Sequence, residues 1–211
     1  MWEEVTVPVF PSGLRYRKAG PNAHFLDASH FIEHVLPPYE DVFRDYTGPF
    51  IFEFQRVGIE RDEFLPRLDA FLSRLPPSYE YAVEVRTPAV LCERYRDILA
   101  AHGVAHVYNH WTSMPALLDQ PQRLSLNFTA PFTLLRLLTA RHMKHGDAVK
   151  VYEPYDRLVR PLPSMRADTI RLIRQAAIEQ RRAYVLVNNR TEGHAPLTIQ
   201  ALVDELRSGD S

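Results

Sequence analysis

The clearest indication of the fold is Tyr184-Val185-Leu186-Val187-Asn188-Asn189, followed by Arg190-Thr191-Glu192-Gly193-His194-Ala195-Pro196. Its opening apolar residues, aromatic or β-branched for the most part, predict a strand that ends in polar asparagines. A periodic segment over residues 196–206 then predicts a helix. A strand that passes through a short polar turn into a helix is the repeating unit of a parallel α/β protein.

The same rhythm extends through the rest of the chain. Strands are predicted at residues 49–55, 79–86, 104–109, 132–138 and 183–189, and helices at 62–75, 88–101, 167–181 and 196–206. Residues 27–43 are expected to be helical in part, with a break at Pro37-Pro38, and residues 4–10 to form a partial strand. Strands that alternate with helices imply crossover connections and a parallel sheet, although this rhythm alone fits a closed barrel and an open sheet equally.

Composition narrows the function classes. The chain has 211 residues with 25 basic and 26 acidic side chains, so a nucleic-acid or anionic-membrane partner is not favoured. One cysteine, Cys92, permits neither an intrachain disulfide nor a cysteine metal cluster. No Gly-x-Gly-x-x-Gly or Walker-type motif follows a strand. We expect a single cytoplasmic domain over residues 1–211, because no secretory signal or membrane-length apolar run is present.

Three segments resemble a known family. They are Ala82-Val83-Glu84-Val85-Arg86 with Pro88, the stretch from Tyr184 to Pro196, and, more weakly, Phe50-Ile51-Phe52-Glu53-Phe54-Gln55. Together with an upstream stretch that begins at Arg15-Tyr16, they are similar to the YecE-like family, domain of unknown function 72. The resemblance implies a parallel (β/α)₈ TIM-barrel fold and leaves the reaction unassigned.

The same resemblance implies an incomplete barrel. The five predicted strands match the fourth to eighth of the family barrel, and the residues for the first three strands are absent; barrels of this class need about 250 residues. An upstream start codon, a natural truncation, or an open sheet covered by a partner or a second copy would each account for this. Open sheet edges favour self-association.

Candidate site residues lie where the strands end, because active sites of such barrels form at the C-terminal ends of the strands. Glu84 and Arg86 share one side of their strand, so Glu84 is either a general acid/base or part of a buried ion pair. His194 is the second catalytic candidate, or a loop histidine held by a backbone bond. The ligand-binding candidates are Glu53, Arg86, Asn109, His110, Arg136, Asn188 and Asn189.

Each ligand-binding candidate also has a structural alternative. Arg136, alone in an apolar run, could clamp an anionic ligand or pair with Glu53 or Glu84. Asn188 and Asn189 could bind a polar ligand or cap the following loop. Residues 141–163 read as a long, mostly irregular loop that either clamps a ligand or merely covers the strand ends. Cys92 is expected inside a helix as a packing residue, no metal site is assigned, and the cofactor is unknown.

Two functions therefore remain. The first is an enzyme that binds a small polar or anionic ligand, similar to a phosphate or a sugar, at the strand ends. The second is a non-catalytic binding or interaction module formed by a truncated barrel.

Overall fold

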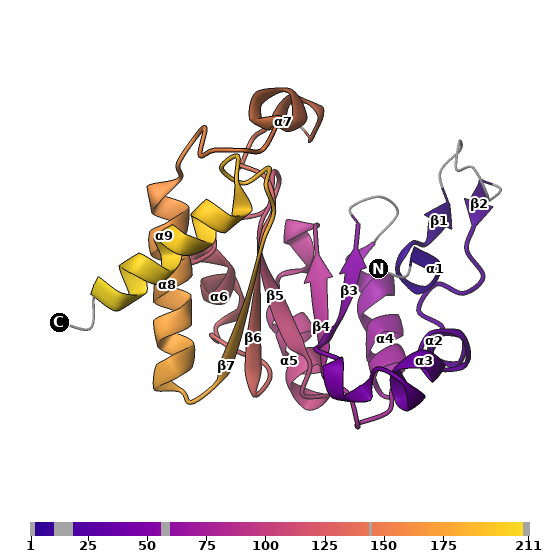
Figure 1. Cartoon of the computed structure of the whole chain (residues 1–211). Helices are drawn as coiled ribbons and strands as arrows, with labels where there is room; N and C mark the ends of the chain where they lie inside the picture. The colour runs from indigo at the N-terminus through magenta and orange to yellow at the C-terminus, as the bar shows by residue number, and fades with distance from the viewer. Residues whose placement is uncertain (1–2, 11–18, 56–59, 144, 209–211) are drawn as a thin grey trace. The chain divides into compact units, whose positions relative to one another are not determined.

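A computed structural model describes residues 3–10, 19–55, 60–143 and 145–208 (Figure 1). The chain divides into two compact units, Met1–Val104 and Ala105–Ser211, and each is described by itself below. Arg15 and Tyr16, part of the resemblance noted above, lie outside the described residues.

Unit 1 combines a small hairpin-like pair, short helices and a parallel strand pair. Its elements are α1 (Glu3–Thr6), β1 (Val9–Phe10), β2 (Gly20–Pro21), α2 (Ala28–His34), α3 (Pro37–Asp41), η1 (Arg44–Tyr46), β3 (Phe50–Phe54), α4 (Arg61–Leu72), β4 (Tyr81–Val85), η2 (Pro88–Val90) and α5 (Glu93–Ala101). Strands β1 and β2 are antiparallel, whereas β3 and β4 are parallel and in register from Phe50↔Tyr81 onward.

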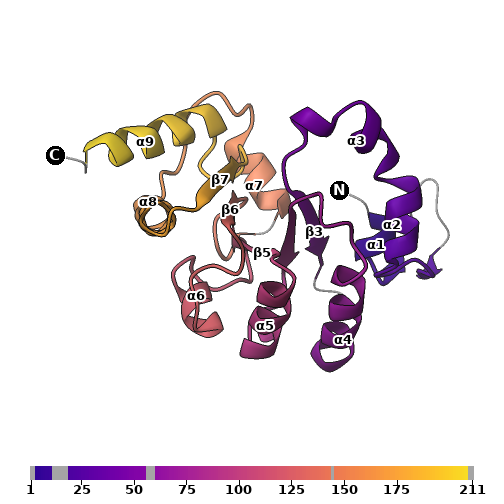
Figure 2. The same ribbon diagram turned by 90° about the horizontal axis from the view of Figure 1, so that it is seen from below.

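Alternation along β3 separates an apolar face from a polar one. Phe52 packs edge-on against Phe71 of α4 at 4.9 Å between ring centroids, and Phe54 packs on Phe64 at 4.9 Å. Both views place α4 beside β3 (Figures 1 and 2). Because successive side chains of a strand point to opposite faces, Glu53 lies on the face away from α4.

Unit 2 contains three parallel strands in the order β5, β6, β7, with helices packed beside them. Its elements are β5 (Ala105–His110), α6 (Asp119–Leu124), β6 (Phe132–Leu137), α7 (His145–Tyr152), α8 (Pro163–Ile178), β7 (Arg182–Val187) and α9 (Ala195–Ser208). Each strand leads into helical structure before the next begins, as parallel pairing requires.

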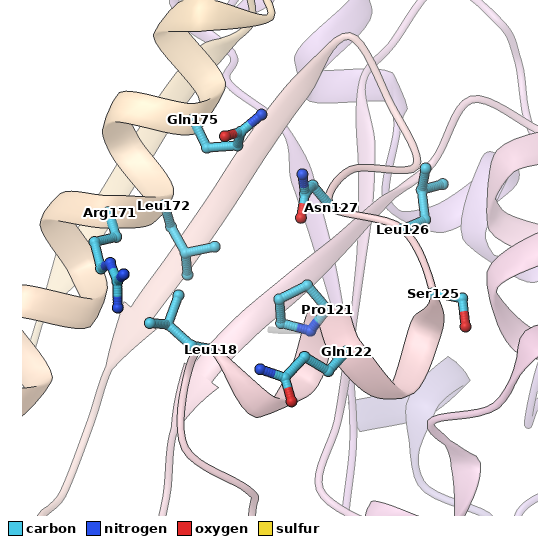
Figure 3. A pocket seen from close by; sticks show the side chains of 9 residues that line it. All are labelled: Leu118, Pro121, Gln122, Ser125, Leu126, Asn127, Arg171, Leu172 and Gln175. Atoms are coloured by element: carbon cyan, nitrogen blue, oxygen red, sulfur yellow. The ribbon is translucent and has the colours of Figure 1, made fainter.

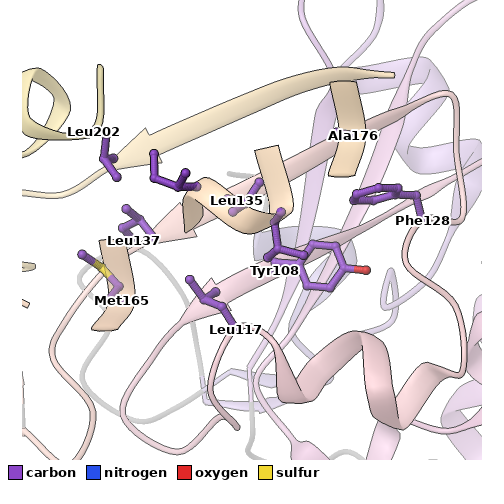
Figure 4. Close-up of a cluster of buried hydrophobic side chains, with 10 residues drawn as sticks. Tyr108, Leu117, Phe128, Leu135, Leu137, Met165, Ala176 and Leu202 are labelled. Atoms are coloured by element: carbon purple, nitrogen blue, oxygen red, sulfur yellow. The ribbon is translucent and has the colours of Figure 1, made fainter. Parts of the chain in front are cut away.

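The core of unit 2 lies between its strands and helices α8 and α9 (Figure 4). Tyr108 of β5 and Leu135 and Leu137 of β6 contribute to this cluster together with Met165 of α8 and Leu202 of α9, all nearly fully buried. The alternate strand residues therefore point to the opposite, helix-free face of the strands.

The structure confirms the parallel α/β class, and each of the five predicted strands lies within two residues of its predicted bounds. Among the described strands, β3 hydrogen-bonds only to β4 and β7 only to β6, so no closed barrel forms. Two local expectations hold only in part. Residues 141–163 are mostly irregular, as expected, but contain helix α7. The segment 4–10 ends in the expected partial strand, the two-residue β1, but begins with helix α1.

One local expectation is wrong: Cys92 precedes helix α5 instead of lying inside a helix. Its backbone is extended at φ −143° and ψ 168°, and it occupies the N-cap position of α5. The predicted helix 88–101 is therefore two pieces, the 3₁₀ turn η2 and helix α5. The sequence pattern did not reveal this break, because Val90 and Leu91 are apolar and buried and so continue the spacing of a helix.

Candidate functional site

Three predicted site residues of unit 1 form one buried ionic cluster. Glu53 and Glu84 are register partners on β3 and β4, and they are 3% and 0% exposed. Arg86 Nη2 lies 2.6 Å from Glu53 Oε1, and Arg86 Nε lies 3.3 Å from Glu84 Oε1. The ion pair considered in the sequence is therefore present, with one guanidinium serving two carboxylates. An acid/base role for Glu84 stays a prediction.

Unit 2 carries a matching polar row on its helix-free face. Asn109 of β5 is the register partner of Arg136 of β6, which in turn is the partner of Leu186 of β7. Asn109 is fully buried and Arg136 is half-buried. Gln120 of α6 fixes the strand here, because its Nε2 donates to the Asn109 carbonyl at 2.9 Å. Sequence reasoning missed Gln120, which lies outside the predicted strands and helices.

His110 does not join this row, although it follows Asn109 directly. It ends β5 on the opposite face, where the backbone N–H groups of Leu138 and Thr139 donate to its carbonyl at 3.2 and 3.4 Å. The pKa of His110 is lowered to about 4, mainly by burial and also by the charge of Arg141. A backbone hydrogen bond with Thr139 and the charge of Glu192 act in the opposite direction. At neutral pH the imidazole is therefore uncharged.

Several buried polar side chains on the segments that follow the strands of unit 2 have an atom without a hydrogen-bond partner among the described residues. We call His110, Thr139, Tyr152 and Arg190 the rim cluster. Within the part of the chain that the structure describes, His110 Nδ1, Thr139 Oγ1, Tyr152 Oη and Arg190 Nε are buried and make no hydrogen bond. Buried polar atoms normally have partners, so each of these needs an explanation such as a bound molecule or water.

Electrostatic effects of Glu192 reach two members of the rim cluster, Tyr152 and His110. Burial raises the pKa of the Tyr152 phenol, the charge of Arg160 lowers it, and Glu192 raises it. Glu192 acts on His110 as well. Tyr152 ends helix α7, which lies at the end of unit 2 to which β5, β6 and β7 point (Figure 1). Sequence reasoning placed Tyr152 only in a loop and missed Thr139 and Arg190, which carry no motif of their own.

Glu192 is a fully buried structural centre of this region. Arg166 Nη2 donates to Glu192 Oε2 at 2.7 Å, and Thr198 Oγ1 donates to the same oxygen at 2.7 Å. The backbone N–H of Leu162 donates to Oε1. The carboxylate therefore ties the start of α8 to the start of α9, and its charge is matched by Arg166.

The Asn-Asn-x-x-x-Gly-His string shapes the loop after β7. Asn188 Oδ1 accepts from the Arg190 N–H at 2.9 Å, and Asn189 Oδ1 accepts from the Ala195 N–H at 2.8 Å. His194 Nδ1 accepts from the Leu197 N–H at 3.2 Å, at the first turn of α9. These contacts match the structural alternatives for all three side chains, and their ligand or catalytic roles stay predictions.

A groove of 680 Å³ lies elsewhere in unit 2, between α6 and α8 (Figure 3). Its lining comes from Leu118, Pro121, Gln122, Ser125, Leu126, Asn127, Arg171, Leu172 and Gln175. Arg171 is its only ionisable side chain, and Asn127 precedes β6 instead of following it. The groove therefore lacks the acid/base groups of the strand ends.

The described residues hold neither a metal-binding group of side chains nor a membrane-length apolar helix. No three histidine, cysteine, aspartate or glutamate side chains among them are arranged as a metal site. No helix in the same part of the chain has both the length and the apolar character to cross a bilayer.

Comparisons with known proteins place the chain in a family. The model of "Protein of unknown function DUF72" matches residues 18–211. The chain belongs to the DUF72 family. No protein with a curated description matches this DUF72 chain.

Two solved DUF72 structures share its fold. The protein from Thermotoga maritima has a TM-score of 0.57 at 18% identity, covering 86% of this chain and 65% of its own. The protein from Enterococcus faecalis has a TM-score of 0.63 at 14% identity, covering 88% of this chain and 68% of its own. This DUF72 chain thus spans about two thirds of each solved relative, and at these identities the likeness concerns the fold alone.

Proposed function

We propose that this protein binds a small anionic molecule at the rim cluster and acts on it by proton transfer through His110. The observation that carries the proposal is the group of buried, unpartnered polar atoms of His110, Thr139, Tyr152 and Arg190, within the described residues. A ligand with several oxygen atoms would satisfy such donors and acceptors together.

Charge favours an anion over a neutral molecule. Arg141 and Arg160 act on His110 and Tyr152 respectively, and Arg190 adds a third guanidinium. The carboxylate of Glu192 is already paired with Arg166. The surplus of positive charge suits a phosphate or carboxylate group, which guanidinium binds in bidentate fashion.

His110 supplies the chemistry in this proposal. Because its pKa lies near 4, the ring stays neutral at physiological pH and Nδ1 can accept a proton or a hydrogen bond. Tyr152, whose pKa is raised, keeps its phenolic proton and can donate it to an oxygen of the ligand.

Isothermal titration calorimetry of the full chain with inorganic phosphate tests the binding step. We expect saturable binding that Arg190→Met weakens about tenfold or more, the loss typical of one charge-assisted contact. Arg174→Met is the matched control, because Arg174 is exposed on α8 and its guanidinium contacts only a carbonyl of Glu205. Glycerol serves as the neutral probe and should not bind.

Equal phosphate affinity in Arg190→Met and Arg174→Met would overturn the rim-cluster assignment. Arg136→Leu then reports on the helix-free face: weakened phosphate binding in that variant alone would place the anion beside Arg136 and Asn109. Failure of every anion to bind would leave the second candidate function, an interaction module, which the exposure of strand β7 favours.

A further inference from the structure

Strand β7 is far more exposed than its neighbours. Every residue of β5 is buried, and β6 is buried except for Arg136, whereas Leu186 of β7 is 47% exposed and Arg182 and Ala183 are also exposed. Figure 1 shows β7 beside β6 at one side of this strand set. Natural sheets protect such edges with charges, prolines or bulges, and β7 has only Arg182 at its first position.

The backbone of β7 determines which groups face outward. The N–H of Asn188 donates to Leu137 of β6 at 2.8 Å, so residues 184, 186 and 188 direct their backbone groups toward β6. In a parallel ladder the alternate residues direct theirs to the other side. Ala183, Val185 and Val187 therefore present N–H and C=O groups along the open edge.

We propose that a second copy of this chain pairs its own β7 antiparallel with this edge, in a two-fold dimer centred on Val185. With Val185 opposite the partner's Val185, Ala183 lies opposite the partner's Val187. All outward backbone groups of the strand then meet outward groups of the partner as hydrogen-bonded pairs. A shift by two residues in either direction leaves some of these groups unpaired.

The side chains of β7 are also compatible with the register centred on Val185. On the helix-free face, Leu186 lies opposite the partner's Tyr184, an aliphatic–aromatic pair that covers the exposed leucine. Arg182 lies opposite the partner's Asn188, which is neutral, so no like charges face each other. Because the interface is self-complementary, a copy of the chain satisfies it without any other partner.

Disulfide trapping tests the register in the Cys92→Ser background, where the introduced thiol is the only one. Residues opposite each other in a hydrogen-bonded pair have Cα atoms about 5.5 Å apart, within disulfide range. We therefore expect Val185→Cys to form a covalent dimer under mild oxidation faster than Leu186→Cys. Random collision predicts the reverse order, because Leu186 is the more exposed of the two.

Sedimentation velocity of the full chain provides the second measurement. We expect a dimer that Leu186→Lys weakens at least tenfold, while Ile178→Lys, a new charge at a residue 76% exposed at the end of α8, leaves it intact. A monomer at all concentrations would overturn the proposal and leave the edge to a different chain. A dimer unchanged by Leu186→Lys, or faster trapping of Leu186→Cys, would place the interface elsewhere.

Discussion

Arg86 pairs with two buried carboxylates on adjacent strands, so substitutions of these three residues should differ in their cost to stability. Glu53 receives the shorter contact, 2.6 Å against 3.3 Å for Glu84. Removing the guanidinium leaves two negative side chains facing each other in a place that water hardly reaches. Removing the charge of Glu84 alone leaves the Arg86–Glu53 pair in place.

We accordingly predict that Arg86→Met lowers the free energy of unfolding by about 3–5 kcal/mol, the usual cost of breaking a buried ion pair. Glu84→Gln should lower it by less than about 2 kcal/mol, because the amide can still accept a hydrogen bond from Arg86. Urea unfolding at pH 7 measures both. If Glu84 is an acid/base, Glu84→Gln should fold and lose turnover; a large stability loss without a specific activity defect would contradict that role.

Gly193 is the residue where a side chain fits worst. Its φ is +116°, and a Cβ atom there would lie 2.5 Å from the carbonyl oxygen of Arg157. Gly193→Ala should therefore cost about 2–4 kcal/mol, from backbone strain together with the steric clash. Gly103→Ala is the matched control, because Gly103 also has positive φ, +63°, and has nothing within 4 Å of its Cβ position.

We expect Gly103→Ala to cost only about 1 kcal/mol, the conformational part alone. Thermal unfolding followed by circular dichroism compares the two variants. Equal losses of stability in the two variants would mean that the backbone near Arg157 shifts to accommodate the new methyl group, and that the loop is more adaptable than its contacts suggest.

At the scale of elements, strand β5 carries two buried histidines, and its stability should depend on pH. Burial lowers the pKa of His106 to about 4, and a hydrogen bond to Gln120 partly offsets this. His106 and His110 both have folded pKa values below the ordinary 6.5, so the unfolded chain binds more protons between about pH 6.5 and 4. Stability should therefore be full above pH 6.5 and fall as the pH drops through this window.

For His106 alone the expected loss is about 2 kcal/mol at pH 5 and about 3 kcal/mol near pH 4, from about 1.36 kcal/mol per pKa unit. Chemical denaturation of the full chain at pH 7 and pH 5 measures it. His106→Leu should flatten the pH dependence even if it lowers stability at pH 7. An unchanged pH dependence in that variant would assign the acid sensitivity to other groups.

The elements also show what the sequence could predict. Strands were found correctly because their apolar runs are short and bounded by polar or turn residues, as in 81–85 and 132–137. Helix α7 was missed because residues 141–163 mix charges and aromatics without a long apolar stripe. In unit 1, the Glu84–Arg86 pair was predictable from alternation along one strand, whereas Glu53 joins it from the neighbouring strand. The rim cluster was not predicted, because Thr139, Tyr152 and Arg190 carry no motif that marks them in the sequence.

At the scale of the whole molecule, the chain spans 65% and 68% of two solved DUF72 relatives, and β7 has an open edge among the described strands. If dimerisation covers that edge, folding and association are linked. The urea midpoint should then rise with protein concentration across the range in which the dimer forms. Leu186→Lys should abolish that dependence, and a midpoint independent of concentration in the parent chain would show that stability does not draw on association.

The loop after β7 has a consequence for comparing genomes. Its most recognisable letters, Asn188, Asn189, Gly193 and His194, make contacts to nearby backbone that build a turn. Residues with these contacts identify the conformation of a turn. Two proteins that share these residues can be assumed to share this turn, but the match gives no warrant for transferring a substrate from one to the other.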